Sequence, residues 1–467
     1  MIKSTQDLYL IRSKVKTDIF KKIFTAGIIL SSLSLPELSS QNIKTLNLET
    51  AIDLALQNNH LLNIKKLQVN EKEQKVMEDR IKYLPTVGIG GTYQYNTNLP
   101  SILIEQGRFG QLPFGTMIIP LPAIDEVIEV GKHNVYNAGV TLYQPVSQIG
   151  KINAGVKVSK TELQIAKREQ DKAAYQVKQG VEKLYFGLLI LQKKIEEAEI
   201  KLLLAGTKLT DAENALSAGK TTESAIYGLS AGVADEEQNL LKLRIEYDDY
   251  AADLIQVTGL HTSTLPGLQP VPADSLLPGL SDIDTAIVQA SSNNYDLKIA
   301  SLYNTKADFA IRAGRLSYLP DIGILGGYTY QEGTEIYPRN NTFIGASLKW
   351  NLQDVLSNNA VIKQRIFSKK QAEENLENTR MQVNKDIAKA FRKRNQAAEL
   401  IKVASKVVEF RRADLKIQAD RRMAGLNLES DLLTAKAAMV KAESDLFSAQ
   451  MNYRIALSEL EILTGRY

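Results

Sequence analysis

The sequence predicts a mainly α-helical fold with a small β portion, and it predicts that this fold is built twice. Three observations lead to this: two segments of alternating apolar and small residues, two very long heptad patterns, and an internal repeat that contains both. The segment RIKYLPTVGIGGTYQY at residues 80–95 returns as RLSYLPDIGILGGYTY at residues 315–330. Each copy joins a charged helical pattern to an alternating run, so the chain is expected to make the same junction twice.

The repeat covers residues 46–260 and 281–466. Thr50-Ala51-Ile52 and Thr285-Ala286-Ile287 match at an offset of 235 residues, whereas Ala218-Gly219 and Ala424-Gly425 match at an offset of 206. The difference of 29 residues lies between Tyr95 and Gly139 of the first copy. Residues 261–280 are rich in proline and are predicted to link the halves.

Both halves contain the same parts in the same order. Each begins with a helical segment of about 35 residues that ends at a Tyr-Leu-Pro sequence, because the residue before a proline is disfavoured in a helix. A β-hairpin (86–145 or 321–351), a long helix, a tip (217–224 or 423–430) and a returning helix are expected to follow. The predicted helix-to-strand junctions are Tyr83, Leu84 and Pro85 in the first half, and Tyr318, Leu319 and Pro320 in the second.

The alternating runs have one apolar face that ends in aromatic residues, and one small or polar face. Residues 86–95 are about as long as a tilted membrane-spanning strand, and tyrosines at one end with Trp350 near the other suit an aromatic girdle. An ordinary soluble sheet would give the same pattern. Four strands cannot close a barrel that shields its backbone from lipid, so membrane strands would require several chains to share one barrel.

The long helices follow a heptad pattern. From Val177 the apolar positions recur at alternating steps of four and three residues as far as Leu216, and the second half repeats most of them from Val383. A helix of about 65 to 70 residues is about 100 Å long at 1.5 Å per residue. Each half is therefore expected to place a strand hairpin at one end and a helical turn far away at the other.

Composition excludes several classes of function. The net charge of +4 is too small to indicate nucleic acid, and the chain has no cysteine and only three, widely separated histidines. It has no recognisable nucleotide-binding, nucleophile or metal motif, so an enzyme and a cofactor are not expected. Residues 1–40 are predicted to be an export signal and a flexible N-terminus, because Lys21 and Lys22 precede an apolar run at 23–35. The heptads and the lack of catalytic motifs would also suit an alternative function, that of a soluble coiled-coil scaffold or interaction protein.

The ordered set of repeated motifs resembles the TolC family of outer-membrane efflux proteins. The resemblance covers nearly the whole chain from Leu46, and it rests on the repeated YLP junctions, the AGxxxES tips and the terminal Thr-Gly of each half. It implies a homotrimer in the outer membrane, with a shared 12-stranded β-barrel in lipid and a periplasmic α-barrel. Such a trimer would be the exit duct of a tripartite efflux or type I secretion system.

The resemblance also implies partners and site residues. A periplasmic adaptor protein would contact the tips at Ala218, Gly219, Ala424 and Gly425, and an inner-membrane pump would act indirectly. Asp431 matches the family aspartate six residues after the tip glycine, whereas the first half has Ala225 there. Three copies of Asp431 would form a cation-sensitive constriction, unless the side chain is merely solvated on a helix. Residues 96–134 would be an outer loop, either neutral in function, folded over the mouth or in contact with a surface partner. The transported substrate stays open.

Overall fold

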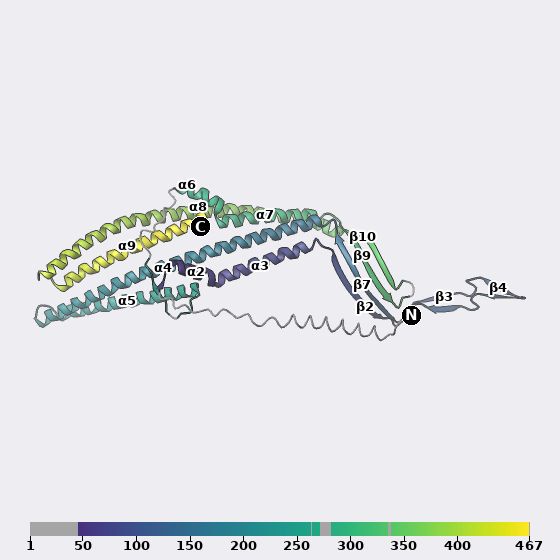
Figure 1. Ribbon diagram of the computed structural model, residues 1–467, viewed down its shortest axis with the longest axis horizontal. Coiled ribbons are helices and arrows are strands. Elements are labelled where there is room, and N and C mark those ends of the chain that lie inside the picture. The colour runs from purple at the N-terminus through teal and green to yellow at the C-terminus, as the bar shows by residue number, and fades with distance from the viewer. Residues whose placement is uncertain (1–44, 263, 271–281, 335–337, 467) are drawn as a thin grey trace, which may run out of the picture. The chain divides into compact units, whose positions relative to one another are not determined.

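The two halves of the chain fold into the same series of helices and strands. The computed structural model describes residues 45–262, 264–270, 282–334 and 338–466 (Figure 1). The expected export signal at 1–40 and much of the expected linker lie outside the described residues. The prediction of a mainly helical chain with a small β portion is confirmed.

The first half contains four helices and the strands that follow or precede them. Their bounds are α2 (Leu48–Asn58), α3 (His60–Ile81), β2 (Thr86–Tyr95), β7 (Asn134–Pro145), α4 (Ile149–Ser217) and α5 (Glu223–Thr258). Two short strands, β1 (Thr45–Leu46) and β8 (Gly267–Leu268), pair in parallel beside them. The buried Tyr185 hydroxyl of α4 lies 3.0 Å from the Leu46 carbonyl oxygen and 2.6 Å from that of Gln269, so α4 holds this small sheet in place.

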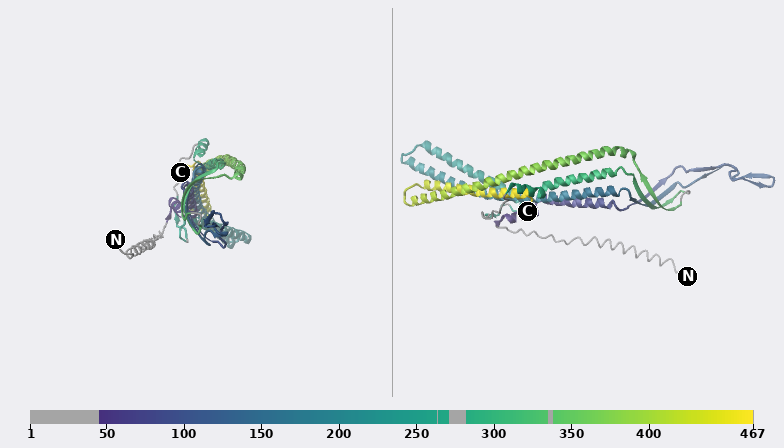
Figure 2. Two further views of the ribbon diagram at one scale, coloured as in Figure 1. Left: turned by 90° about the vertical axis from the view of Figure 1, so that its right-hand side faces the viewer. Right: turned by 90° about the horizontal axis from the view of Figure 1, so that it is seen from above.

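The second half repeats this order. Its elements are α6 (Ile283–Asn293), α7 (Tyr295–Leu316), β9 (Asp321–Glu332), β10 (Asn340–Lys349), α8 (Leu352–Met423) and α9 (Glu429–Thr464). The helical hairpins α4–α5 and α8–α9 both project to the end opposite the four main strands (Figure 2).

The helices and the strands share one lateral order. The main sheet is antiparallel with the order β10–β9–β7–β2, and the helices that continue these strands pack in the order α8–α7–α4–α3. Ion pairs join successive helices: Lys65 of α3 to Glu169 of α4, Lys306 of α7 to Glu162 of α4, and Lys369 of α8 to Asp308 of α7. This part of the chain is therefore a single wall, with α3 and β2 along one side and α8 and β10 along the other (Figure 1).

The hydrophobic core lies where the short helices meet the long ones. One cluster joins α2, α4 and α5 through Ala51, Val181, Leu188 and Leu254, and a second joins α6, α8 and α9. The buried positions of α4 and α8 include many of the predicted heptad positions, among them Val177, Val181, Leu188 and Leu191 in α4 and Val383 and Ile387 in α8. The heptad pattern thus marks the side of each long helix that packs against its neighbours.

The sequence pattern suggested one continuous helical segment before each Tyr-Leu-Pro. The structure instead breaks this segment into two helices. In the first half the break is at Asn59, whose backbone is extended and whose side-chain oxygen accepts hydrogen bonds from the N–H groups of Leu61 and Leu62. Asn294 does the same for Leu297 in the second half. Asparagine favours such an N-cap over a helix interior, and this preference outweighs the helical periodicity around it.

Two repeated dipeptides of the sequence meet in the fold. The Asn58 side chain donates to the Thr258 carbonyl (3.2 Å), and the Asn294 side chain donates to the Leu463 carbonyl (2.9 Å). The end of α5, at Thr258-Gly259, therefore contacts the first Asn-Asn pair, and the end of α9, at Thr464-Gly465, contacts the second. Gly259 and Gly465 end α5 and α9 with φ near +67°, a conformation that glycine adopts most easily.

The segment between β2 and β7 forms two further antiparallel ribbons. β3 (Ser101–Ile104) pairs with β6 (Glu126–Glu129), and β4 (Gln111–Phe114) pairs with β5 (Met117–Pro120). We call residues 96–133 the arm. The sequence predicted only a loop here, because strands of four residues interrupted by prolines are too short to show a clear period of two.

Gly465→Ala should destabilise the protein more than Gly425→Ala, although both glycines have nearly the same positive φ. A Cβ at Gly465 would lie 2.7 Å from the Cβ of Asn293, whereas a Cβ at Gly425 would meet no atom within 4 Å. Gly425→Ala should cost about 1 kcal/mol of unfolding free energy through backbone strain alone. Gly465→Ala should cost a further ~1–3 kcal/mol through crowding. Thermal unfolding of the purified variants measures both, and equal midpoints would contradict the role given to the Asn–Gly contact.

Candidate functional site: the wall, its tips and its junctions

The two tips have the same backbone geometry. Gly219 and Gly425 have φ of +69° and +71°, and each begins the turn that ends a long helix. The N–H of Lys220 donates to the Ala215 carbonyl, and the N–H of Leu426 donates to the Arg421 carbonyl. Each bond joins residues five positions apart in the sequence, which is the pattern of a Schellman turn. Ala218, Gly219, Ala424 and Gly425 are all exposed. Neither glycine is crowded by its own chain, so the tips present small side chains and open backbone to the outside.

Asp431 lies in the first turn of α9, directly after the second tip. Its side chain is exposed, and its Oδ2 accepts a hydrogen bond from the N–H of Leu428 at 3.0 Å. A carboxylate here also interacts favourably with the positive end of the helix dipole. This capping role was not predictable from the sequence, because Leu428 stands where a capping box has serine or threonine. At the corresponding position of the first tip, Ala225 offers no acceptor.

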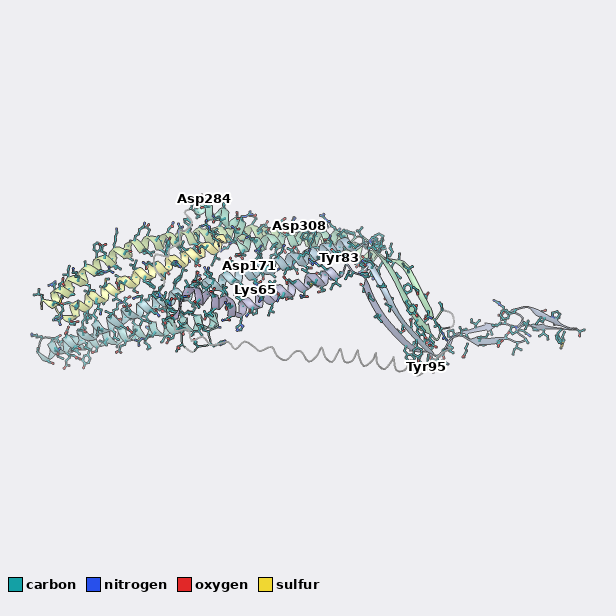
Figure 3. All side chains as sticks on the ribbon, viewed as in Figure 1. Lys65, Tyr83, Tyr95, Asp171, Asp284 and Asp308 are labelled. Atoms are coloured by element: carbon teal, nitrogen blue, oxygen red, sulfur yellow. The ribbon has the colours of Figure 1, made fainter. Side chains whose placement is uncertain are left out.

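The two helix-to-strand junctions are fixed by side chains from the strand-to-helix connection of the first half. Gln144 of β7 donates to the Tyr83 carbonyl at 3.2 Å. The Ser147 hydroxyl donates to the Pro320 carbonyl and accepts from the N–H of Ile322, both at 2.8 Å. Leu84 and Leu319 are exposed, and Tyr83 lies at the junction while Tyr95 lies at the far end of β2 (Figure 3). The repeat could not have revealed Gln144 or Ser147, because the equivalent positions are Trp350 and Gln353.

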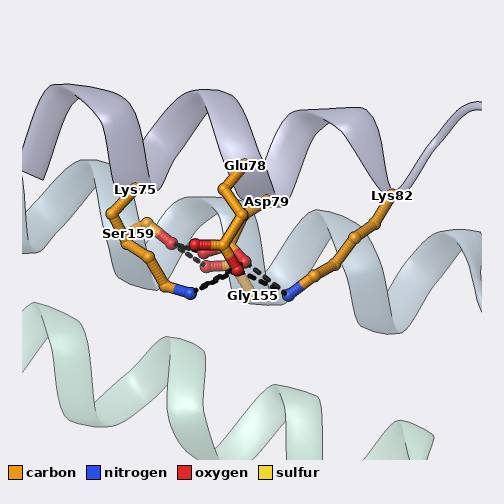
Figure 4. A network of polar contacts seen from close by, with 6 residues as sticks. All are labelled: Lys75, Glu78, Asp79, Lys82, Gly155 and Ser159. Carbon is orange, nitrogen blue, oxygen red and sulfur yellow. Dashed lines mark hydrogen bonds and ion pairs between the residues drawn. The ribbon is translucent and has the colours of Figure 1, made fainter.

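Behind the first junction, a carboxylate is buried between α3 and α4. Asp79 lies 2.6 Å from the Lys82 Nζ and 3.8 Å from the Lys75 Nζ, and it accepts a hydrogen bond from the Ser159 hydroxyl (Figure 4). Burial alone would raise the pKa of Asp79, but the hydrogen bonds from Lys82 and Ser159 and the two lysine charges together hold that pKa below its ordinary value. Asp79 therefore stays ionised and joins the two helices.

The second half fills the equivalent place differently. The positions corresponding to Asp79 and Ser159 are Gly314 and Arg365. Arg365 donates to the Ala310 carbonyl, and Asn358 donates to the Gly314 carbonyl at 3.0 Å. A Cβ at Gly314 would lie 2.9 Å from the Arg365 Nη1. A buried carboxylate in one half is thus replaced in the other by hydrogen bonds from an arginine and an asparagine side chain to backbone carbonyls.

A second, half-buried carboxylate joins three helices. Glu459 of α9 lies 3.3 Å from the Lys183 Nζ of α4 and 3.0 Å from the Lys393 Nζ of α8. Burial would raise the pKa of Glu459, but hydrogen bonding and charge from Lys393 and Lys183 outweigh it and hold the pKa below its usual range. Because α4 belongs to the first half and α8 and α9 to the second, this cluster connects the two halves.

Both sides of the wall expose apolar side chains. On α8, Leu400, Val403, Val407 and Phe410 are exposed at steps of three and four residues. On α3, Leu61, Ile64 and Leu67 are exposed at steps of three residues. The strands at these sides, β10 and β2, each have a partner on one edge only within the described chain. An exposed apolar stripe with heptad spacing, such as that of α8, is typical of a helix–helix interface with another chain.

Two kinds of site are not found among the described residues. No group of three or more histidine, aspartate or glutamate side chains is placed to hold a metal ion there. In the same part of the chain, every helix is too short or too polar to cross a lipid bilayer.

The fold and these surfaces define a class of protein in which each chain is one segment of a wall. The wall continues from helices into strands, and both of its sides lack a partner within the described chain. Solved structures share this fold. The Campylobacter jejuni CmeC outer membrane channel aligns with a TM-score of 0.68 at 15% identity, covering 90% of this chain and 85% of that one. The Vibrio cholerae outer membrane protein VceC aligns with a TM-score of 0.68 at 15% identity (90% and 96%). The open state of the Neisseria gonorrhoeae MtrE outer membrane channel aligns with a TM-score of 0.67 at 16% identity (90% and 88%).

The sequence itself matches the family model described as outer membrane efflux protein over residues 51–260 and 286–466. The chain belongs to this family, and the resemblance deduced from its repeated motifs is confirmed. No curated protein matches the chain by sequence.

Glu459→Gln should lower stability at neutral pH and weaken its dependence on acid. A carboxylate whose pKa is lowered in the folded state stabilises the protein above its unfolded pKa of about 4.3, and this contribution is lost as pH falls through the folded value. The neutral amide removes the charge of a charge-assisted cluster, for a loss of about 1–2 kcal/mol of unfolding free energy at pH 7.

Thermal unfolding at pH 7 and pH 4 measures the effect. Glu199→Gln is the matched control, because Glu199 pairs with Arg244 at 2.9 Å on an exposed surface, and should change unfolding free energy by less than about 1 kcal/mol. The role given to Glu459 would be wrong if the two variants behaved alike.

Proposed function

We propose that three copies of this chain close into one tube that conducts substrates passively out of the cell. The observation that carries the proposal is the single wall with the matching order β2–β7–β9–β10 and α3–α4–α7–α8. Neighbouring strands alternate in direction, so β10 of one copy and β2 of the next are antiparallel in a closed ring. Three copies then give a 12-stranded barrel, and the exposed apolar side chains of α8 become seams of an α-barrel, against α3 of the next copy near the strands and against α5 of the next copy nearer the tips.

The strands suit the outer membrane. Val87, Ile89, Ile344 and Leu348 are exposed large apolar side chains on β2 and β10, and Tyr93, Tyr95 and Trp350 lie toward the strand ends. In lipid, every backbone N–H and C=O of the strands must have a partner, and closure of the ring supplies the partners that β2 and β10 lack in one chain. The YLP junctions, Tyr83 to Pro85 and Tyr318 to Pro320, are then the level at which the tube leaves the membrane for the periplasm.

The tips are proposed to meet a periplasmic adaptor protein. Ala218, Gly219, Ala424 and Gly425 are small and exposed at the end farthest from the strands, so a partner helix hairpin can approach their backbone closely. The adaptor connects the duct to an inner-membrane pump that supplies energy and selects the substrate. A soluble scaffold does not account for the membership of an outer membrane efflux family.

The native mass of the full-length protein, extracted from isolated outer membranes by mild detergent, tests the duct. We expect a trimer of the 51.8 kDa chain that conducts ions when reconstituted into planar bilayers. A monomer or dimer found in the soluble fraction would overturn the shared barrel and with it the duct.

We further propose that Asp431 lines a cation-sensitive constriction, with one carboxylate from each copy. Asp431→Asn keeps an oxygen that can accept from the Leu428 N–H, so it removes the charge without removing the cap. We expect weaker block of conductance by multivalent cations in Asp431→Asn, with only a small fall in the thermal midpoint from the lost interaction with the helix dipole. Ala225→Asp, at the equivalent position of the other tip, should strengthen the block by adding a second set of three carboxylates. Unchanged block in both variants would rule out a role for these positions in the pore.

A further inference from the structure

The arm is a continuous extension of the membrane strands. Hydrogen bonds follow the β2–β7 ladder outward: the N–H of Asn96 donates to the His133 carbonyl (2.8 Å), and the N–H of Val130 donates to the Pro100 carbonyl (2.8 Å). Beyond β3–β6, the N–H of Gln106 donates to Asp125 Oδ1 (2.8 Å), and the N–H of Phe109 donates to the Leu121 carbonyl (2.9 Å). β4–β5 follows and forms the end of the arm (Figure 1).

The base of the arm is fixed to the second half of the chain. The N–H of Lys132 donates to the Gly333 carbonyl (2.8 Å), just after β9. A Cβ at Gly333 would lie 2.3 Å from the Asn134 carbonyl oxygen, so the two backbones touch there. The His133 ring stacks on Tyr95 with 5.7 Å between ring centroids. The direction in which the arm leaves the sheet is therefore set by contacts from both halves.

The ribbon formed by β4 and β5, at the outer end of the arm, has a composition unlike the rest of the chain. The segment from Phe109 to Ile124 contains no charged residue. In the β4–β5 register, Leu112 faces Ile119 and Phe114 faces Met117, and these pairs share one face because they are two residues apart along each strand. We call these four residues the inner face of the ribbon; their exposed fractions are 54% for Leu112, 77% for Phe114, 72% for Met117 and 39% for Ile119. The other face carries Pro113 and Ile118.

A ribbon of this kind needs a partner. Two isolated strands are at best marginally stable in water, and an uncharged apolar ribbon with open edges associates with other strands unless it is covered. Every charged residue of the arm lies nearer its base, in the segments around β3 and β6: Glu105, Arg108, Asp125, Glu126, Glu129 and Lys132. Threefold symmetry brings like charges of equivalent residues together at the axis, so a segment that meets its own copies there should be uncharged.

We propose that the inner faces of the three copies pack against one another on the threefold axis and form a cap over the outer end of the duct. This rests on the trimer of the proposed function. Each fixed base holds its ribbon at the same height, so the three inner faces meet in register, as the apolar seams of a three-stranded coiled coil do. The cap is held by apolar contact alone, and substrates leave when the three ribbons separate.

The chain has no cysteine, so single cysteines can report which face of the ribbon meets another copy. Phe114→Cys places a thiol on the inner face, and Ile118→Cys places one on the other face of the same ribbon, at a similar exposure of 66% for Ile118. Isolated outer membranes carrying either variant are treated with a short trifunctional maleimide. We expect covalent trimers for Phe114→Cys and uncrosslinked chains for Ile118→Cys.

Native mass measured on the same samples separates the possible failures. A trimer in which neither cysteine crosslinks, or both crosslink equally, would overturn the cap and leave the duct standing. Crosslinking of Phe114→Cys to a different outer-membrane protein would also overturn the cap, in favour of a surface partner. A monomer would overturn the duct and the cap together.

A second measurement reports on closure. Phe114→Glu puts three like charges at the axis and should raise the single-channel conductance of reconstituted trimers, whereas Ile118→Glu should not. Equal conductance in both variants and the unaltered protein would show that the ribbons do not close the mouth.

Discussion

The unpartnered edges of a four-stranded sheet are the constraint on which the rest of this structure depends. A backbone N–H or C=O without a partner costs several kcal/mol in hydrocarbon, and one chain leaves a row of such groups on both β2 and β10. Each of these strands continues into the helix at the same side of the wall. The requirement that the strands find partners therefore applies to α3 and α8 as well, whose exposed apolar stripes lie on the same two sides.

Some contacts join the two halves of the chain, and others, within each half, fill equivalent places with different residues. The pairing of β7 with β9 and the Glu459 cluster cross from half to half, whereas Asp79 with Ser159 and Gly314 with Arg365 occupy equivalent places by different chemistry. Each place needs contact between two helices, and either a shielded ion pair or side-chain hydrogen bonds to backbone provides it. In both places the polar groups between the helices have partners, as buried polar groups generally require.

The sequence was sufficient wherever a long period or a repeated motif carried the signal. The heptads that begin at Val177 and Val383, the turn at Gly425 and the strand at residues 86–95 all fall into this group. Contacts between parts distant in sequence were not predictable: Ser147 has no repeated counterpart, and Asp79 sits in a segment whose charges look like ordinary helix surface. Asn59 could have been recognised as a helix break, because the Asn-Asn pair repeats. The strands of the arm could not, since four residues give too little periodicity.

The arm also changes the symmetry of the assembly that we propose. Because each chain supplies the same unit twice, the helical middle of a trimer approximates six equivalent units around the axis. Only the first half carries an arm, and only the second tip carries Asp431 where the first has Ala225. The approximate sixfold arrangement is thus reduced to a true threefold one at both ends of the tube. Any partner or passing molecule would meet six similar surfaces along the middle of the tube. At the entrance and at the exit it would meet three equivalent copies of a surface that only one half of the chain provides.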